Sequence, residues 1–178
     1  MAALSAFILY AALIAFTLFL AKKKNWKQTL EYLGVFCKKF SLSQTVVESI
    51  LLFVSMFFLL AVELFVFSLF NLDDSQNVAV VISQLSIFAI IVVATIGPFA
   101  EELFFRGFLQ KHIGVILSSL VFALLHFSFG SIVEVAGAFT ASLVLGYWVR
   151  YRSKNLWPAI IAHALYNIVS MAFVLVVQ

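Results

Sequence analysis

The chain has 178 residues, of which 65% are hydrophobic and 11% are charged, with a net charge of +3. A soluble globular domain is roughly half apolar and a quarter charged, so this composition excludes an ordinary soluble domain and favours a chain solvated by lipid. One cysteine, Cys37, excludes an internal disulfide.

The first apolar run, residues 2–21, has the length of a bilayer span, roughly 20 residues, and is followed by three lysines at residues 22–24. Because no basic segment precedes this run and no small-residue cleavage site follows it, it is predicted to be a retained anchor. In residues 25–40, apolar side chains recur at steps of three and four. That period predicts an amphipathic helix in the membrane interface.

Five further apolar runs predict five more spans, and Pro98 near the end of the second of them is expected to start a new helical stretch or kink the old one. The runs cover about residues 46–70, 78–99, 113–129, 132–149 and 156–177. The predicted fold is therefore an all-α, polytopic integral membrane protein with about six transmembrane helices and an interfacial helix.

The basic residues predict the topology. If the N-terminus lies outside, all 11 lysines and arginines fall on or toward the cytoplasmic side, whereas the opposite loop at residues 71–77 carries only acids. The positive-inside rule is thereby satisfied. The basic charge then reflects membrane topology, and the expected partner is the lipid bilayer and not nucleic acid.

The segment after Pro98 carries the first polar cluster within a span, and an ionisable residue at membrane depth is a functional-site hypothesis. Glu102 and Arg106 are four residues apart, share a helix face and are expected to neutralise each other. Glu101 is rotated from Glu102 by about 100° and lacks that partner, which makes it a candidate general base. The alternative is two helix-end acids with a salt bridge.

Two further clusters contain histidines. Phe122 lies one turn before His126 and is expected to wall its ring, while His163 and Asn167 share a helix face and can both donate hydrogen bonds to an oxyanion. Packing and helix–helix hydrogen bonding are the alternatives. Helical rises of about 12–21 Å from the cytoplasmic turns place these clusters at overlapping depths, so that they are expected to share a cavity.

In this order, the three clusters resemble the CAAX protease and bacteriocin-processing (CPBP or Abi) family of intramembrane glutamic endopeptidases, which is related to the eukaryotic prenyl-protein endopeptidases. The matching patterns are Glu-Glu-x-x-x-Arg, Phe-x-x-x-His and His-x-x-x-Asn. The resemblance covers about residues 80–178, the expected catalytic core. Residues 1–79 are expected to be anchor helices of the same single membrane domain, residues 1–178.

The resemblance implies a membrane-embedded peptidase that cleaves a membrane-associated or lipidated protein or peptide, without a metal or other cofactor, at a site opening toward the cytoplasm. By similarity, Glu101 and His126 activate a water molecule, and His163 and Asn167 stabilise the oxyanion. Glu102 and Arg106 are expected to brace the site. Whether the substrate is prenylated stays open.

Two other interpretations of the same residues stay open. Glu101, His126 and His163 are a possible two-histidine, one-carboxylate zinc site of a membrane peptidase, although the compact HExxH motif is absent. The second interpretation is that the protein is a membrane scaffold or a proton-coupled transporter. In a transporter, Glu63 and Gln84 would extend a proton relay.

Overall fold

The computed structural model describes residues 2–37 and 41–177, and this part of the chain is helical without any strand. Five helical stretches are long and apolar enough to cross a membrane, which confirms the predicted all-α, polytopic architecture. They are Ala3–Leu20, Leu42–Leu69, Ile87–Phe129, Ile132–Ser153 and Trp157–Val176.

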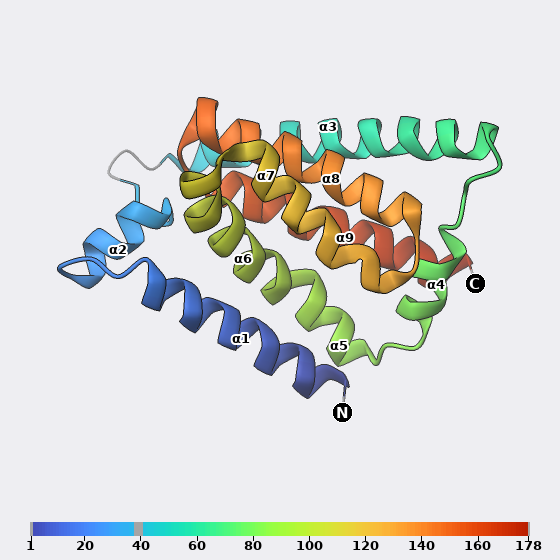
Figure 1. The fold of residues 1–178 in the computed structure, drawn as a ribbon, viewed down its shortest axis with the longest axis horizontal. Helices are drawn as coiled ribbons and strands as arrows, with labels where there is room; N and C mark the ends of the chain where they lie inside the picture. Colours follow the sequence, from blue (N-terminus) through green and yellow to red (C-terminus); the bar gives the residue numbers. More distant parts are fainter. Residues whose placement is uncertain (1, 38–40, 178) are drawn as a thin grey trace.

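The stretch Ile87–Phe129 accounts for two of the six predicted spans. Its 43 residues are about twice the length that one crossing needs. Helix α7 (Gln110–Leu125) is broken at Gly114, where φ is 83° and ψ is 172°, a backbone conformation that glycine adopts readily. Figure 1 shows that α7 beyond this point runs back alongside α6 (Gly97–Glu102). The reversal between these two spans therefore lies at Gly114.

The interfacial helix is shorter than the predicted span of residues 25–40. Helix α2 runs over Trp26–Leu33, and the Asn25 side chain caps its first turn by accepting from the Gln28 N–H. The helix ends at Gly34, whose φ of 83° is a left-handed conformation that commonly terminates helices. The predicted helical positions at residues 38–40 lie outside the described residues.

The prediction of one helix from residue 78 was also wrong. The chain forms a short helix α4 (Gln76–Ser83), turns, and begins helix α5 (Ile87–Ile91) with Ser86 as its N-cap. A serine side chain that accepts from the third following N–H stabilises a helix start and competes with an uninterrupted helix. Gln84 therefore lies exposed in the turn and not inside a span.

The segment around Pro98 keeps a continuous helical path with a change of register. A π-helical turn, η1 (Val92–Ile96), precedes α6, and the Gly97 N–H bonds to the Val92 carbonyl five residues back. Pro98, which has no N–H, is the second residue of the α-helical stretch that follows. The expectation of a new helical stretch at Pro98 therefore agrees with the structure, although the chain does not bend away there.

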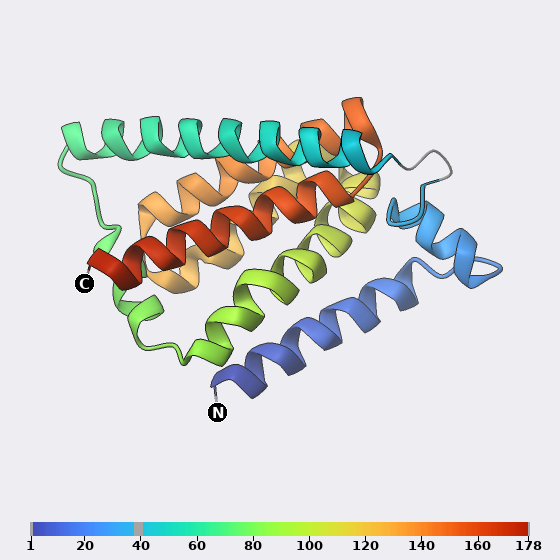
Figure 2. The same ribbon diagram turned by 180° about the vertical axis from the view of Figure 1, so that it is seen from behind.

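The core is formed where helix α3 (Leu42–Leu69), helix α8 (Ile132–Tyr147) and helix α9 (Trp157–Val177) pack together, with α6 against α9 and α1 (Ala2–Leu20) beside α6 (Figures 1 and 2). A cluster of buried apolar side chains lies at this junction. It includes Leu52, Met56, Leu103, Leu145, Leu156 and Ile160. This packing places the polar side chains of α6 and α9 against each other inside the bundle.

The two ends of the bundle differ in charge. One end of the bundle is formed by the α1–α2 connection, the start of α3, the reversal at Gly114 and η4 (Trp148–Ser153). The basic residues of these segments lie at this end. The opposite end carries Asp74. Both views show the loop between α3 and α4, which contains Asp74, at the end opposite to the α1–α2 connection (Figures 1 and 2). This separation agrees with the division of charge that the sequence predicts, and it leaves the orientation in the membrane as a prediction.

Asp74 caps helix α8 from the loop between α3 and α4. Its carboxylate accepts hydrogen bonds from the Ser131 hydroxyl at 2.6 Å, the Ile132 N–H at 2.7 Å and the Val133 N–H at 3.1 Å. The Ser131 hydrogen bond, assisted by the two N–H bonds, holds the pKa of Asp74 below its usual value against an opposing effect of burial. The acidic loop therefore fixes the start of α8 next to the end of α7.

Candidate active site

Glu102 and Arg106 form an ion pair in the bundle core, as their four-residue spacing predicts. Arg106 Nη1 lies 2.8 Å from Glu102 Oε1, and the two side chains are 1% and 0% exposed. His163 on α9 places Nδ1 at 2.8 Å from the same oxygen. Because an ionised carboxylate only accepts, the His163 Nδ1–H is the donor. Glu102 therefore links the cation of its own helical segment to the imidazole of α9.

The buried pair has polar atoms that the described residues do not satisfy. Glu102 Oε2 and both terminal nitrogens of Arg106 have no hydrogen-bond partner there, so the 2.8 Å contact is an ion pair without hydrogen-bond alignment. The Arg106 guanidinium lies 4.7 Å from the centre of the Phe122 ring, a cation–π contact. Buried groups of this kind ordinarily bind ordered water.

Glu101 has different surroundings from Glu102. Its Oε2 lies 3.8 Å from His163 Nε2, and its side chain is 18% exposed. This separation is longer than a direct hydrogen bond, and a water molecule beside the two groups can contact both. As the helix-face argument predicts, Glu102 pairs with the Arg106 guanidinium and Glu101 does not, although both carboxylates approach the His163 ring.

The N-terminal helix contributes Tyr10, which sequence reasoning missed because residues 1–79 were assigned to anchoring. The Tyr10 hydroxyl is close enough to the Glu101 carboxylate to interact with it electrostatically. The ring lies against Gly97, where an added Cβ would stand 3.0 Å from the Tyr10 hydroxyl. A tyrosine in the middle of an apolar span was the one available signal. Helix α1 therefore approaches the candidate base and does more than anchor the chain.

His126 lies where α7 ends and a 3₁₀ turn, η3 (His126–Phe129), begins. Its ring is 4.5 Å from the Phe122 ring, which confirms the predicted wall, and the Phe122 ring is 6.1 Å from that of His163. His126 Nδ1 lies 2.9 Å from the Phe122 carbonyl. Since a carbonyl only accepts, Nδ1 carries the proton and the neutral ring keeps its lone pair on Nε2.

Asn167 is half-buried on α9, one turn beyond His163. Its amide makes no hydrogen bond to the described residues, which leaves its two N–H donors for another acceptor. The structure thus joins Glu101, Glu102 and His163 through direct or near contacts and connects His126 to them through Phe122. Their catalytic roles stay a prediction.

Glu134 is a further acidic side chain at this site that the sequence analysis did not identify. The pattern Ser131-x-x-Glu134 is typical of a capping box, in which the glutamate folds back on the helix start. Ser131 Oγ does accept from the Glu134 N–H at 3.0 Å, but Asp74 takes the neighbouring donors. The Glu134 carboxylate instead interacts electrostatically with both site histidines and with Glu101.

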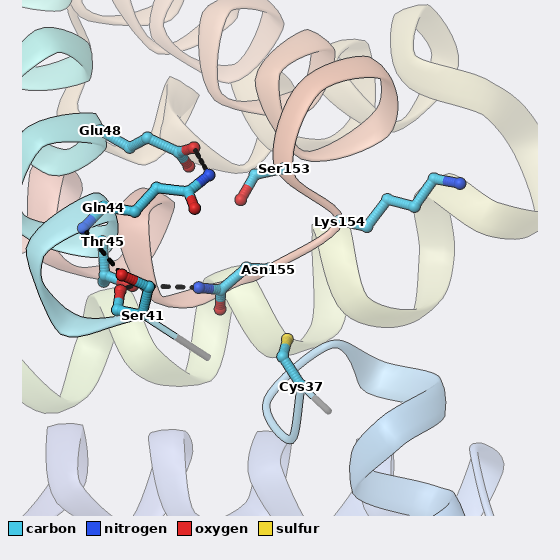
Figure 3. Close-up of a pocket in the computed structure, with 8 residues that line it drawn as sticks. All are labelled: Cys37, Ser41, Gln44, Thr45, Glu48, Ser153, Lys154 and Asn155. Atoms are coloured by element: carbon cyan, nitrogen blue, oxygen red, sulfur yellow. Dashed lines mark hydrogen bonds between the residues drawn. The ribbon is translucent and has the colours of Figure 1, made fainter. Parts of the chain in front are cut away.

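A separate polar hollow of about 200 Å³ lies between the start of α3 and the loop before α9 (Figure 3). Glu48 accepts from the Gln44 amide at 2.8 Å and from the Trp148 indole N–H at 3.2 Å, and the Asn155 amide donates to Thr45 Oγ1. These polar groups pair with one another. These hydrogen bonds connect α3 to η4 and to the following loop. No predicted site residue lines the hollow.

Comparison with known proteins identifies the region that contains these residues. Residues 82–169 match the family of type II CAAX prenyl endopeptidases described as Rce1-like. The chain is also similar to an uncharacterised protein, YpbD, of Bacillus subtilis (strain 168), with 46% identity over 57 residues. That similarity covers 32% of this chain and 30% of the relative. No solved structure matches the chain.

The family match and the fold agree with each other. A membrane-embedded protease of this family needs helices that cross a bilayer, and the described chain has five apolar stretches of that kind. The matched residues contain all three polar clusters, including the Glu102–Arg106 ion pair and the contact from His163 to Glu102. The family implies a peptidase with a membrane-associated protein substrate. Residues 82–169 of this chain are therefore similar to the Rce1-like family of CAAX prenyl endopeptidases.

Proposed function

We propose that this protein is an intramembrane endopeptidase that cleaves a membrane-associated or lipidated protein or peptide with a water molecule activated by Glu101 and His126. The observation that carries the proposal is the opposition of Glu101 and His163, whose Oε2 and Nε2 atoms are 3.8 Å apart within the helical bundle. A water at this position has an acceptor on one side and an imidazole on the other.

Glu101 is the proposed general base. Its carboxylate takes a proton as the water oxygen attacks the peptide carbonyl carbon, and the carbonyl oxygen becomes an oxyanion. The Tyr10 hydroxyl, which interacts with this carboxylate, is proposed to orient it by donating a hydrogen bond. The ion pair with Arg106 engages Glu102 instead, so that the two adjacent acids are proposed to act differently.

His126 is proposed to assist the proton transfer. Its Nδ1–H is held by the Phe122 carbonyl, which fixes the ring and leaves the Nε2 lone pair to accept a proton from the water or from Glu101. When the C–N bond of the tetrahedral intermediate breaks, that proton passes to the leaving amine. The products are a carboxylic acid and an amine, with no covalent intermediate on the protein.

His163 and Asn167 are the proposed oxyanion donors. Because His163 Nδ1–H is already donated to Glu102, His163 can donate to the oxyanion only through Nε2–H, when both ring nitrogens carry protons. The carboxylates of Glu101 and Glu102 flank the ring in that state. Asn167 supplies a second donor from one turn further along α9.

The test compares Glu101→Gln with the native protein. Cells that produce each form at equal levels are compared by proteomic analysis of new peptide termini in the membrane fraction. Cleavage is expected to fall by at least about 100-fold, as loss of a general base typically costs. A matched control is Glu31→Gln on α2, which removes the same charge outside the site. Full cleavage by the Glu101 variant, with unchanged thermal unfolding, would overturn the proposal.

A metal-free mechanism is part of the proposal, and zinc is its competitor. Glu101 and His163 could both face a metal ion, while the described residues contain no group of three or more His, Cys, Asp or Glu side chains arranged to hold one. Metal analysis of the purified protein, together with activity before and after chelation, separates the two. Stoichiometric zinc with activity that is lost on chelation and restored by zinc would favour the metal site.

The orientation is proposed from the charge distribution, with the basic end of the bundle in the cytoplasm and the N-terminus outside. Substrates would then reach the site from the cytoplasmic side. Reporter fusions after residue 37 and after residue 72 test this. We expect cytoplasmic reporter activity only for the first fusion, and the opposite pattern would show an inverted topology.

A further inference from the structure

The connection between α1 and α2 forms a hollow of about 440 Å³ at the basic end of the bundle. We call the segment of residues 18–29 that lines it the basic elbow. Its apolar part comes from the end of α1, and its polar part from three consecutive lysines and the first turn of α2. The lining residues are Leu18, Phe19, Lys22, Lys23, Lys24, Asn25, Trp26 and Thr29.

Further cations approach the elbow from α7 and η4, around the Tyr32 ring of α2. The Nζ atoms of Lys23 and Lys111 lie 4.0 Å and 4.4 Å from the centre of the same Tyr32 ring. Lys111 also donates to the Tyr32 carbonyl. Electrostatic repulsion acts on Lys111 from both Lys23 and Arg150. Three elements distant in sequence therefore place cations at one point.

The described residues do not neutralise this cluster. All ion pairs between described residues lie in the bundle core, among Glu101, Glu102, Arg106 and His163. The single acid of α2, Glu31, is not within ion-pair distance of a described lysine. Like charges held together without an acid repel one another, so the cluster gains stability from an external anion.

The shape of the hollow selects the kind of anion. Leu18 and Phe19 form its side toward α1, and Phe19 and Trp26 are exposed, 74% and 61% respectively. An inorganic phosphate would leave these apolar surfaces in contact with water. A phospholipid would cover them with its glycerol and acyl chains while its phosphodiester meets the lysines. The amphipathic lining therefore favours a lipid over a free anion.

We propose that the basic elbow, together with Lys111, binds the headgroup of an anionic phospholipid. Lys23 and Lys111 supply the charge that recognises the phosphodiester, and Trp26 packs beside the upper acyl chain at the interface. Bound lipid would fasten α2 and α1 to the start of α7. The site does not depend on the proposed peptidase chemistry, because Glu101 and the histidines are not part of it.

The test measures lipid binding to the purified full-length chain by native mass spectrometry. Phosphatidylglycerol and phosphatidylcholine with identical acyl chains are titrated onto the native protein and onto the double variant Lys23→Gln/Lys111→Gln. We expect the native protein to bind phosphatidylglycerol at least about tenfold more tightly than phosphatidylcholine, and the double variant to lose that preference. Lys23→Arg/Lys111→Arg is expected to keep it.

A matched control is Arg152→Gln/Lys154→Gln, which removes two charges from the same end of the bundle outside the elbow. This control is expected to bind phosphatidylglycerol as the native protein does. Equal affinity for both lipids, or an equal loss of preference in the control variant, would overturn the proposal. Displacement of bound phosphatidylglycerol by millimolar inorganic phosphate would do so as well, since it would identify a free-anion site.

Discussion

His163 Nδ1 donates to Glu102 Oε1 across 2.8 Å, and this contact joins residues that are 61 positions apart in the chain. The same oxygen faces Arg106. The opposite ring nitrogen, Nε2, points toward Glu101 at 3.8 Å. The His163 imidazole therefore contacts the buried Glu102–Arg106 ion pair through Nδ1 and faces the partly exposed Glu101 carboxylate through Nε2.

Replacing Glu102 is expected to destabilise the protein strongly. Glu102→Ala leaves the Arg106 guanidinium buried, 1% exposed, without its partner, and an uncompensated buried charge costs about 3–5 kcal/mol. The measurement is the free energy of unfolding in detergent, by denaturant titration of the purified variant and native protein. Cleavage is expected to fall too, because His163 loses the acceptor that orients it.

The double variant Glu102→Gln/Arg106→Met is the control for this interpretation. It removes both charges and keeps side chains of similar length, so much of the lost stability is expected to return. Native-like stability of Glu102→Ala itself would show that the pair contributes nothing to the fold. In the double variant, restored stability without restored cleavage would separate the structural effect from the orientation of His163.

Tyr10→Phe is expected to lower cleavage while preserving the fold. The variant removes the hydroxyl that is proposed to hydrogen-bond to Glu101 and keeps the ring that packs on Gly97. A hydrogen bond to a charged group contributes about 1.5–3 kcal/mol, which corresponds to about a 10–100-fold loss in kcat/KM. Steady-state cleavage and thermal unfolding are measured together. An unchanged kcat/KM in Tyr10→Phe would contradict the proposed contact.

Gly97→Ala is the companion variant. It crowds the Tyr10 ring and is expected to reduce both the cleavage rate and the thermal stability.

Glu134→Gln is expected to shift the pH dependence of cleavage. Glu134 acts electrostatically on the two site histidines, on Glu101 and on Tyr166. Removing its negative charge makes the protonated imidazoles less favourable, so the acid limb of the kcat/KM profile should move to lower pH. Glu63→Gln on α3 also changes the charge near Tyr166 and serves as the control. Identical profiles for Glu134→Gln and the native protein would exclude Glu134 from the site.

Asp74→Asn is expected to lower stability by about 1–2 kcal/mol near neutral pH, because the α8 N-terminus loses a charged acceptor. The folded-state pKa of Asp74 lies below its usual value, which in unfolded chains is about 3.9. The native stabilisation is therefore complete above that value and disappears as the pH falls through the folded-state pKa. Unfolding of both forms is measured between neutral and acid pH, and their difference should shrink toward acid.

Asp73→Asn is the control for the Asp74 prediction. Asp73 carries the same charge at the adjacent position, but among the described residues it accepts only the Ser75 N–H, so its replacement is expected to change stability much less. Equal effects of the two substitutions would attribute the stabilisation to net charge at this end of the bundle. A pH-independent difference between Asp74→Asn and the native protein would contradict the role of the ionised carboxylate.

The sequence alone determined the features that follow from local spacing and composition. A 65% hydrophobic chain in runs of bilayer length must form membrane helices, because only helices satisfy their own backbone there. Four-residue spacing sets which side chains share a face, and it correctly paired Glu102 with Arg106 and Phe122 with His126. The motifs themselves indicated the family that residues 82–169 match.

The tertiary structure decided which distant elements reach the site and where helices stop. Tyr10 and Glu134 approach it only because α1 packs beside α6 and α8 beside α7, and no local period encodes such packing. The position of Glu134 in the sequence is typical of a capping residue, but in the structure Asp74, from another loop, caps the start of α8. The break at Gln84 and the reversal at Gly114 likewise depend on competing caps and positive φ. The three-dimensional arrangement therefore supplied contacts that the motifs did not contain.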